Sequence, residues 1–343
     1  MFFEQPKKEN ELMREKLMSL AKQPQNNPAS FESLDLYSHY ALTPIQHDYP
    51  GKTPTIWNSV YKTLDIDYVM AMVIGDIEYT EQIVKFFKQD PRYIGGGVGV
   101  GFKDKIIKDL DELDPLAQAV GSVNVIKKMP SGNLRGYNTD GIGYLESLIP
   151  LIGEDPSRIK VVMLGAGGTG NSVVFALAGV VRELIILNRS LEKAKNLADR
   201  VNKYTGKNNC HALGEESIKE EILDADVIIN VSTKGSAGEL EEYSSLAVAK
   251  LPATIENIRK NREEAEKNFG LIRSGTIISD IILGNNDTPF ITLAKERGFK
   301  TLDGLPMVIN QGVESFWLLH GEEMKSKGIK KEDVAKIIID ATK

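Results

Sequence analysis

Lys103 and Asp140 have side chains suited to proton transfer, and both stand next to glycines in the sequence. Lys103 follows a glycine-rich run at residues 95–101, and Asp140 lies at a predicted strand-to-helix junction. A lysine presented at a glycine-lined strand end can lose hydration and become a usable acid or base. Most lysines at such positions are surface charges, and most aspartates at a helix start are N-caps. The residues by themselves therefore leave the catalytic and the structural interpretation open.

A glycine-rich turn further along the chain indicates the kind of cofactor with which a proton donor would act. Gly165, Gly167 and Gly170 have the spacing G-x-G-x-x-G between a predicted strand at 161–164 and a helix, and a second strand follows at 183–187. This strand–turn–helix context favours dinucleotide binding: the first glycine allows the tight turn, the second admits the pyrophosphate and the third allows close packing. The helix start adds free N–H groups and a positive dipole end. The alternative is a glycine-rich turn without a ligand.

The end of the second strand distinguishes between the two nicotinamide dinucleotides. Proteins that bind NAD usually place Asp or Glu there for the ribose 2′-hydroxyl. This chain has Asn188, Arg189 and Ser190, with Lys193 one turn later. No carboxylate repels a 2′-phosphate, and Arg189 can pair with it through two hydrogen bonds. We therefore expect NADP(H); the alternative is a solvated arginine that happens to follow a strand.

The composition fits an ordinary globular protein with room for two domains. The chain has 343 residues, of which 41% are hydrophobic and 26% charged. Its net charge of −6 argues against nucleic-acid binding, and no apolar run approaches the roughly 20 residues that span a membrane. The single cysteine, Cys210, and a polar N-terminal stretch are typical of a cytoplasmic protein. The four histidines lack metal-ligand spacing, so we expect no metal.

The order of the apolar patterns predicts an α/β fold with two domains. Residues 1–30 form an N-terminal extension whose first 22 residues have the pattern of an amphipathic helix. Residues 31–143 alternate between strands and helices, which predicts an α/β domain with a mostly parallel sheet. Residues 144–304 contain the glycine turn, which predicts a Rossmann-type, doubly wound dinucleotide-binding domain.

Individual elements follow from the same patterns. In the first domain we expect strands at 36–42, 67–73, 94–100 and 123–127, a loop at 44–54, and helices at 55–64, 79–88 and 104–113. In the second domain we expect strands at 161–164, 183–187, 227–231, 277–283 and 300–302, and helices at 141–151, 172–181, 191–204, 256–268 and 289–297. Helices at 306–320 and 331–342 end the chain, and residues 207–217 read as a variable stretch.

Several motifs together resemble the shikimate dehydrogenase (shikimate/quinate 5-dehydrogenase) family. They occur in the family's order and cover most of residues 34–320. The motifs are Gly121-Ser122-Val123-Asn124, Tyr137-Asn138-Thr139-Asp140-Gly141-Ile142-Gly143, the Gly165 turn with Asn188-Arg189-Ser190, Asn230-Val231-Ser232-Thr233, and Asp303-Gly304-Leu305-Pro306-Met307 with Gln311. A combination of this length is far more specific than the glycine turn alone.

This resemblance implies a function and a set of site residues. The implied reaction is the reversible, NADP(H)-dependent reduction of 3-dehydroshikimate, or a related cyclic keto acid, to shikimate by a monomer or homodimer. The first domain, joined by the C-terminal helices of 305–343, would bind substrate, with the active site in the cleft towards the NADP domain. Lys103 and Asp140 match the family's catalytic pair. The implied substrate contacts are Thr53, Asn124, Thr139 and Gln311. The implied cofactor contacts are Gly165, Ala166, Gly167, Gly168, Thr169, Gly170, Asn188, Arg189, Ser190, Lys193, Val231, Ser232, Ile281 and Gly304.

The departures from the family pattern are concentrated on the substrate side. A Ser-x-Ser-Pro element that holds the substrate carboxylate reads Gly51-Lys52-Thr53-Pro54, and Gly97 and Gly99 replace two polar residues. Leu283 replaces a tyrosine near the nicotinamide, and the segment after Thr233 is longer than usual. Each lost hydrogen bond costs roughly 1 kcal/mol, so three could weaken binding by about two orders of magnitude. Either backbone N–H groups and Lys52 replace them, or the substrate is quinate or another acid. A further alternative is a non-catalytic NADP(H)-binding sensor.

Overall fold

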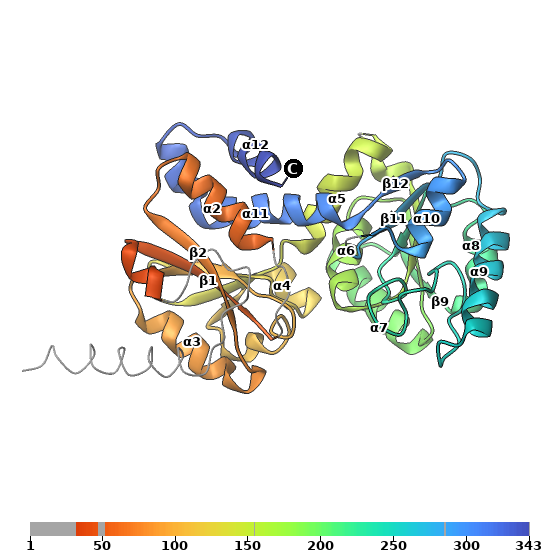
Figure 1. Cartoon of the computed structure of the whole chain (residues 1–343), viewed down its shortest axis with the longest axis horizontal. Coiled ribbons are helices and arrows are strands. Elements are labelled where there is room, and N and C mark those ends of the chain that lie inside the picture. The colour runs from red at the N-terminus through yellow and green to blue at the C-terminus, as the bar shows by residue number, and fades with distance from the viewer. Residues whose placement is uncertain (1–31, 47–51, 154, 285, 343) are drawn as a thin grey trace, which may run out of the picture. The chain divides into compact units, whose positions relative to one another are not determined.

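The structure, a computed structural model, describes residues 32–46, 52–153, 155–284 and 286–342. The chain divides into two units (Figure 1): the first runs through Thr139 and resumes at Gln311, and the second is Asp140–Asn310. The helix expected within residues 1–30 lies outside the described residues. Among the described residues, no helix is both long enough and apolar enough to cross a membrane.

The first unit is built on one mixed sheet of six strands. Its strands are β1 (His39–Ile45), β2 (Tyr68–Ile74), β3 (Tyr93–Gly97), β4 (Glu112–Leu113), β5 (Val125–Lys128) and β6 (Leu134–Tyr137), in the order β2-β1-β3-β5-β6-β4. β1 is parallel to β2 and β3, whereas β5 is antiparallel to both β3 and β6. β5 and β6 form a hairpin whose turn contains Gly132 at a φ of +88°. This hairpin places the start of β5 beside the end of β6.

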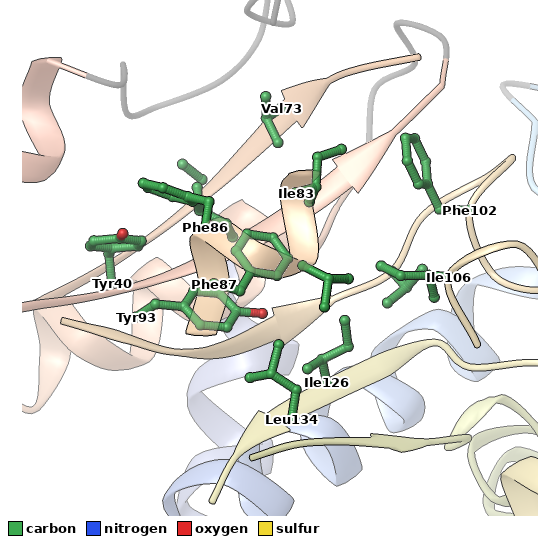
Figure 2. Close-up of a cluster of buried hydrophobic side chains, with 14 of the residues drawn as sticks. Tyr40, Val73, Ile83, Phe86, Phe87, Tyr93, Phe102, Ile106, Ile126 and Leu134 are labelled. Carbon is green, nitrogen blue, oxygen red and sulfur yellow. The ribbon is translucent and has the colours of Figure 1, made fainter. Parts of the chain in front are cut away.

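Helices cover both faces of this sheet. They are α2 (Thr53–Thr63), α3 (Thr80–Gln89), α4 (Pro115–Val120), α11 (Gly304–Ser326), which begins in the second unit, and α12 (Lys331–Ala341). On one face, Phe86 and Phe87 of α3 pack with Tyr40 and Val73 of the sheet in a buried cluster (Figure 2). Elsewhere in the unit, Trp57 of α2 meets Phe316 of α11 edge to face, and the two helices bury their aromatic side chains.

The second unit has a parallel, doubly wound sheet of the Rossmann type. Its strands are β7 (Lys160–Leu164), β8 (Glu183–Leu187), β9 (Cys210–Leu213), β10 (Val227–Asn230), β11 (Ile277–Asp280) and β12 (Lys300–Leu302), in the order β9-β8-β7-β10-β11-β12. Every pairing is parallel. Its helices are α5 (Asp140–Ile152), α6 (Gly168–Ala178), α7 (Leu191–Thr205), α8 (Ile218–Glu221), α9 (Ile255–Phe269) and α10 (Pro289–Glu296). The α8–α10 side chains share one buried cluster with the sheet, and α5, α6 and α7 pack in sequence. The fold class expected from the sequence is confirmed.

The prediction of a helix at 104–113 is wrong. Only a short 3-10 helix, Ile106–Asp109, forms there, and the chain then extends into β4 beside β6. Tertiary contacts of Asp111 explain the difference, because its carboxylate accepts hydrogen bonds from Leu134 N at 2.8 Å and from Lys88 Nζ at 2.7 Å. These partners come from distant segments, so no local pattern could reveal them.

Other boundaries also differ from expectation. β3 ends at Gly97 rather than at residue 100, because Gly99 N donates to Pro44 O and Gly101, with a φ of +90°, turns the chain. β1 begins at His39 and extends through Pro44, where a loop was expected. The strands β4 and β9 and the helices α4 and α8 were not expected, and β6 was expected only as the strand before Asp140, without bounds. For α4 a signal existed, since Asp114 caps its start and Gly121 ends it at a φ of +71°.

Gly141, in the first turn of α5, lets this helix pack directly on α6. A Cβ at this position would lie 2.2 Å from the carbonyl oxygen of Ser172. The Ser172 carbonyl group is part of the α6 backbone and cannot move aside as a flexible side chain could. We therefore expect Gly141→Ala to lower the free energy of unfolding by about 3 kcal/mol, as measured by chemical denaturation. Gly179→Ala at the end of α6 is the control, since its nearest neighbour would lie at 3.5 Å. Equal stability of the two variants would contradict this packing argument.

Candidate functional site

Asn124, Thr139 and Gln311 contact one another in the first unit. Asn124 Nδ2 donates to Thr139 Oγ1 at 2.9 Å and to Gln311 Oε1 at 3.3 Å. Thr139 N donates to Asn124 Oδ1 at 2.8 Å, which fixes the orientation of the amide. The β5–β6 hairpin explains this meeting, because Asn124 precedes β5 and Thr139 follows β6. Three of the substrate contacts implied by the sequence thus form one polar cluster, with Asn124 and Thr139 buried.

The backbone of Lys103 is tied to the same region. Lys103 lies at the end of the loop after β3, where the fully buried Phe102 anchors the chain in the core. The carbonyl oxygen of Lys103 accepts from Val123 N at 2.8 Å, and Val98 N donates to Asn124 O at 2.7 Å. The loop that carries Lys103 is therefore held at both ends by the residues at the start of β5.

The remaining implied catalytic and substrate residues lie at helix starts. Asp140 is the first residue of α5 and is only 5% exposed, directly after Thr139 in the chain. Thr53 is the first residue of α2 and half-buried, next to the exposed Lys52. Gly51 lies outside the described residues.

Gly97 and Gly99 do not offer free backbone amides in place of the missing side chains. Gly97 N donates to Thr43 Oγ1 at 3.1 Å, and Gly99 N donates to Pro44 O at 2.9 Å. A Cβ at Gly97 would lie 2.7 Å from Thr43 Oγ1, so the buried Thr43 side chain leaves no room for a side chain at residue 97. An N–H group donates one good hydrogen bond, so these two amides are already used. If backbone N–H groups and Lys52 replace the lost polar side chains, the N–H groups must therefore come from other residues than Gly97 and Gly99.

The glycine turn of the second unit fits a dinucleotide pyrophosphate. Gly165 has a φ of +112°, and a Cβ there would lie 2.8 Å from Ser232 N. Gly170 lets α6 approach β10, because its Cβ would lie 2.8 Å from Val231 Cγ2. A Cβ at Gly168, the first residue of α6, would meet nothing within 4 Å. The start of α6 therefore has open space beside its free N–H groups, as phosphate binding requires.

The loop after β8 presents cationic side chains. Asn188 Nδ2 donates to Ser190 O at 2.9 Å, and Ser190 Oγ caps α7 by accepting from Lys193 N at 3.4 Å. Arg189 and Lys193 are exposed. The loop backbone is thus fixed by its own polar side chains, while the two cations extend into solvent, where a 2′-phosphate could pair with them.

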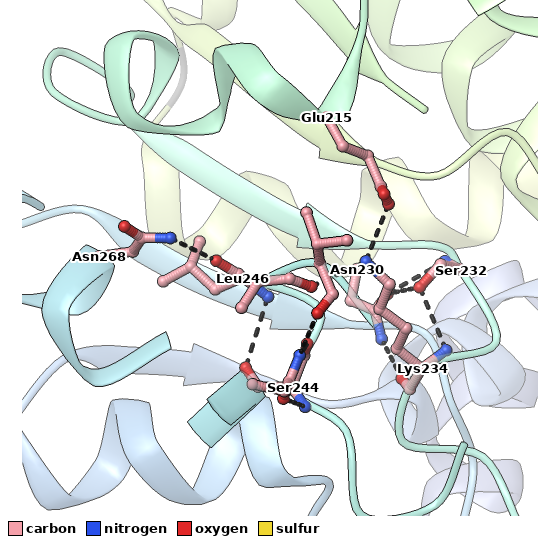
Figure 3. A network of polar contacts seen from close by, with 10 residues as sticks. Glu215, Asn230, Ser232, Lys234, Ser244, Leu246 and Asn268 are labelled. Atoms are coloured by element: carbon pink, nitrogen blue, oxygen red, sulfur yellow. Dashed lines mark hydrogen bonds and ion pairs between the residues drawn. The ribbon is translucent and has the colours of Figure 1, made fainter. Parts of the chain in front are cut away.

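A buried polar network holds the loops after β10 and β11. Asn230 Oδ1 accepts from Ser232 N at 3.0 Å and Ser232 Oγ at 2.7 Å (Figure 3), and Asn230 Nδ2 donates to Asp280 Oδ2 at 3.0 Å. Asp280 also accepts from Ile282 N at 2.9 Å and Thr288 Oγ1 at 2.7 Å. Neither Asp280 nor Thr288 was predicted as a site residue. The signal for Asp280 would have been a polar residue ending a buried parallel strand, where ligands of such sheets bind. The signal for Thr288 would have been a threonine before Pro289 at the start of α10.

Two further implied cofactor residues lie beside this network. Ile281 is half-buried after the end of β11, and a Cβ at Gly304, the first residue of α11, would lie 2.7 Å from Ile281 O. Leu283, the departure from the family's tyrosine, is 46% exposed. The glycine lets α11 begin against the β11 loop without displacing it.

The fold and these sites define a class: α/β dehydrogenases with a Rossmann-type dinucleotide unit and a separate α/β unit that carries a polar cluster. Comparison with known families is more specific. Residues 41–126 match the family model described as "Shikimate dehydrogenase substrate binding domain", and residues 150–245 match "Shikimate / quinate 5-dehydrogenase". The chain belongs to the shikimate dehydrogenase family.

Individual relatives agree with this assignment. The chain is 31% identical over 291 residues to "Shikimate dehydrogenase (NADP(+))" of Alkaliphilus metalliredigens, covering 84% of this chain and 92% of that one. It is 32% identical over 280 residues to the enzyme of the same name from Bacillus mycoides, covering 81% and 90%. Among solved structures, a shikimate dehydrogenase in complex with NADP+ superimposes with a TM-score of 0.67 at 27% identity, covering 89% of this chain and 95% of that one.

Asp280 makes the stability of the second unit depend on pH. Burial raises the pKa of its carboxyl from 3.8 to about 6, although hydrogen bonds from Asn230, Ile282 and Thr288 oppose the rise. Because the folded state favours the protonated form, stability from this group is present at low pH and is lost as the pH rises through about 6. Relative to wild type, Asp280→Asn should therefore gain about 2–3 kcal/mol of unfolding free energy between pH 4 and pH 7.

The measurement is denaturant unfolding of both proteins across this pH range. Thr288→Val is the matched control: it removes one donor that lowers the pKa of Asp280 but leaves the carboxyl able to titrate, so its pH dependence should be at least as large as that of the wild type. Parallel curves for wild type and Asp280→Asn would rule out this role of Asp280.

Proposed function

We propose that this chain is an NADP(H)-dependent dehydrogenase that reversibly reduces 3-dehydroshikimate, or a related cyclic keto acid, to the corresponding alcohol. The observation that carries the proposal is the mutually bonded cluster of Asn124, Thr139 and Gln311 in the unit that also carries Lys103. Relatives at about 31% identity named "Shikimate dehydrogenase (NADP(+))" support the activity and the cofactor. The open start of α6 and the cationic loop after β8 suit NADP(H).

The polar cluster has the chemistry for binding a hydroxylated acid. Amide and hydroxyl groups both donate and accept, and in the free protein those of Asn124, Thr139 and Gln311 bond one another. Thr139 N keeps Asn124 Oδ1 occupied, so Nδ2 is the end of this amide that can turn to a substrate oxygen. Binding then exchanges existing hydrogen bonds for new ones, which leaves no buried polar group unpaired.

Catalysis needs a proton at the substrate oxygen. When bound, the nicotinamide supplies the hydride to the carbonyl carbon. We assign Lys103 the donation of the proton to the carbonyl oxygen, and Asp140 the orientation of Lys103 and a hydrogen bond to a substrate hydroxyl. Lys103 suits this role because hydrogen bonds of Val98 and Val123 hold the loop that carries it, and because an ammonium group can give up a proton.

A second candidate is a dehydrogenase of the same class with a different acid as substrate. It is favoured by Gly97 and Gly99, which lack polar side chains and whose amides are engaged by Thr43 and Pro44. Oxidation of NADPH across a panel of cyclic keto acids, including the products of shikimate and quinate oxidation, separates the two. Highest kcat/KM with 3-dehydroshikimate supports the first candidate, and a preference for another acid supports the second. Silence across the panel together with tight NADPH binding would favour a non-catalytic sensor.

The role of Lys103 can be tested by substitution. Lys103→Ala should abolish turnover, with a loss of at least about 100-fold in kcat, because the proton donor is gone. Its affinity for NADPH should stay nearly intact, as measured by fluorescence titration. Lys105→Ala, which removes an exposed lysine paired with Asp104, is the control and should turn over like the wild type. A Lys103→Ala enzyme that retains most of its turnover would refute the assignment.

Cofactor choice can be tested at Arg189. If this side chain pairs with the 2′-phosphate, Arg189→Leu should weaken NADPH binding by about 1.5–3 kcal/mol and leave NADH binding nearly unchanged. Arg182→Leu is the control, since this exposed arginine precedes β8 and lies at the opposite end of the strand. An equal loss for both cofactors in Arg189→Leu would contradict recognition of the phosphate by this residue.

A further inference from the structure

Lys234 is a buried lysine in the loop after β10, with 8% of its surface exposed. Its Nζ donates to Glu215 Oε1 at 2.8 Å and to Ala247 O at 2.9 Å (Figure 3). Glu215 follows β9, and Ala247 belongs to the long segment after Thr233. A buried ammonium group is tolerated only with such partners. One side chain therefore ties together three segments of the second unit that are far apart in sequence.

The strand order shows what lies between the tied loops. β9 and β10 are not neighbours, because β8 and β7 separate them in the sheet. At the carboxyl ends of β7 and β8 are the glycine turn and the loop Asn188–Ser190. In a doubly wound sheet the dinucleotide lies along this edge, with its adenosine ribose at the end of the second strand, here β8. The Lys234–Glu215 pair thus joins the two loops that flank the expected place of the adenosine half.

The backbone of Lys234 is coupled to the glycine turn. Lys234 N donates to Ser232 Oγ at 3.2 Å, and Lys234 O accepts from Asn230 Nδ2 at 2.9 Å. Ser232 N in turn lies 2.8 Å from the Cβ position of Gly165. A displacement of Lys234 would therefore reach the turn through Ser232.

The long segment is itself anchored on α9. Asn268 Nδ2 donates to Leu246 O at 2.8 Å, and Asn261 Nδ2 donates to Ser244 O at 3.1 Å and to Val248 O at 3.2 Å. Ser244 and Leu246 are buried. The carbonyl group of Ala247, which accepts from the ammonium group, thus belongs to a segment whose neighbouring carbonyls are hydrogen-bonded to α9.

We propose that Lys234, paired with Glu215, is a positioning residue that sets the affinity for the adenosine half of NADP(H). This inference rests on the proposed function only in that the cofactor is NADP(H). Lys234 does not act on the reacting atoms. It holds the loops after β9 and β10 at the separation that the adenosine half requires, with the carbonyl group of Ala247 as its second anchor.

The test compares Lys234→Met with Lys160→Met by calorimetry. Lys160 is a matched control, being 6% exposed and paired with Glu221 and Asp224 at 2.9 and 2.6 Å, but at the amino end of β7, away from the ligand edge. The probes are NADPH and 2′-phospho-ADP-ribose, which has the adenosine half without nicotinamide. We expect Lys234→Met to raise both Kd values about tenfold, while kcat at saturating NADPH stays within about twofold. Lys160→Met should leave both Kd values unchanged.

Glu215→Gln provides a second variant if Lys234→Met does not fold. It keeps the size of the side chain and an acceptor oxygen but removes the charge, so both Kd values should rise by at least about threefold. Unchanged binding of 2′-phospho-ADP-ribose in a folded Lys234→Met or Glu215→Gln protein would overturn the proposal, as would an equal loss in Lys160→Met. A wild-type protein that binds neither probe would instead overturn the proposed function.

Discussion

The second unit depends on one close approach, that of the turn after β7 to the residues after β10. Gly165 combines a φ of +112° with a Cβ position 2.8 Å from Ser232 N, so only glycine can stand there. Gly170 meets Val231 in the same way one turn later. Because of these contacts, α6 begins at the carboxyl edge of the sheet with its N–H groups unobstructed. The site for a phosphate group is therefore a consequence of backbone packing, before any side chain is considered.

Buried polar side chains keep this approach in place. Asn230 holds Ser232, Asp280 holds Asn230, and Lys234 bonds Glu215 and the carbonyl group of Ala247. Polar groups of this kind are costly to bury unless each is paired, and a fully paired network specifies one arrangement. The first unit uses the same principle on a smaller scale, since Asn124 and Thr139 fix each other at the ends of a hairpin. Both groups of polar side chains are thus held in place by their own hydrogen bonds.

Local signals explain which parts of the molecule could be predicted from sequence. The glycine turn and β8 were predicted correctly because the spacing of the glycines and a short apolar run determine them within a few residues. Segment 104–113 was misjudged because Leu134 and Lys88 hold Asp111 in an extended chain. The pairings of Lys234 with Glu215 and of Asp280 with Asn230 could not be predicted, because the partners lie 19 and 50 residues away in the chain. The polar cluster of Asn124 and Gln311 came from the family resemblance, since no spacing links residues so far apart.

The measurement that tests the account most directly is the initial rate of nicotinamide reduction with shikimate as substrate. The account predicts turnover that saturates with shikimate or a closely related cyclic hydroxy acid such as quinate. It also predicts a kcat/KM at least about tenfold higher with NADP+ than with NAD+, since the loop Asn188–Ser190 offers Arg189 and no carboxylate, and Lys193 follows in the first turn of α7. No reduction of NADP+ with either acid by a folded protein that binds NADPH would contradict it.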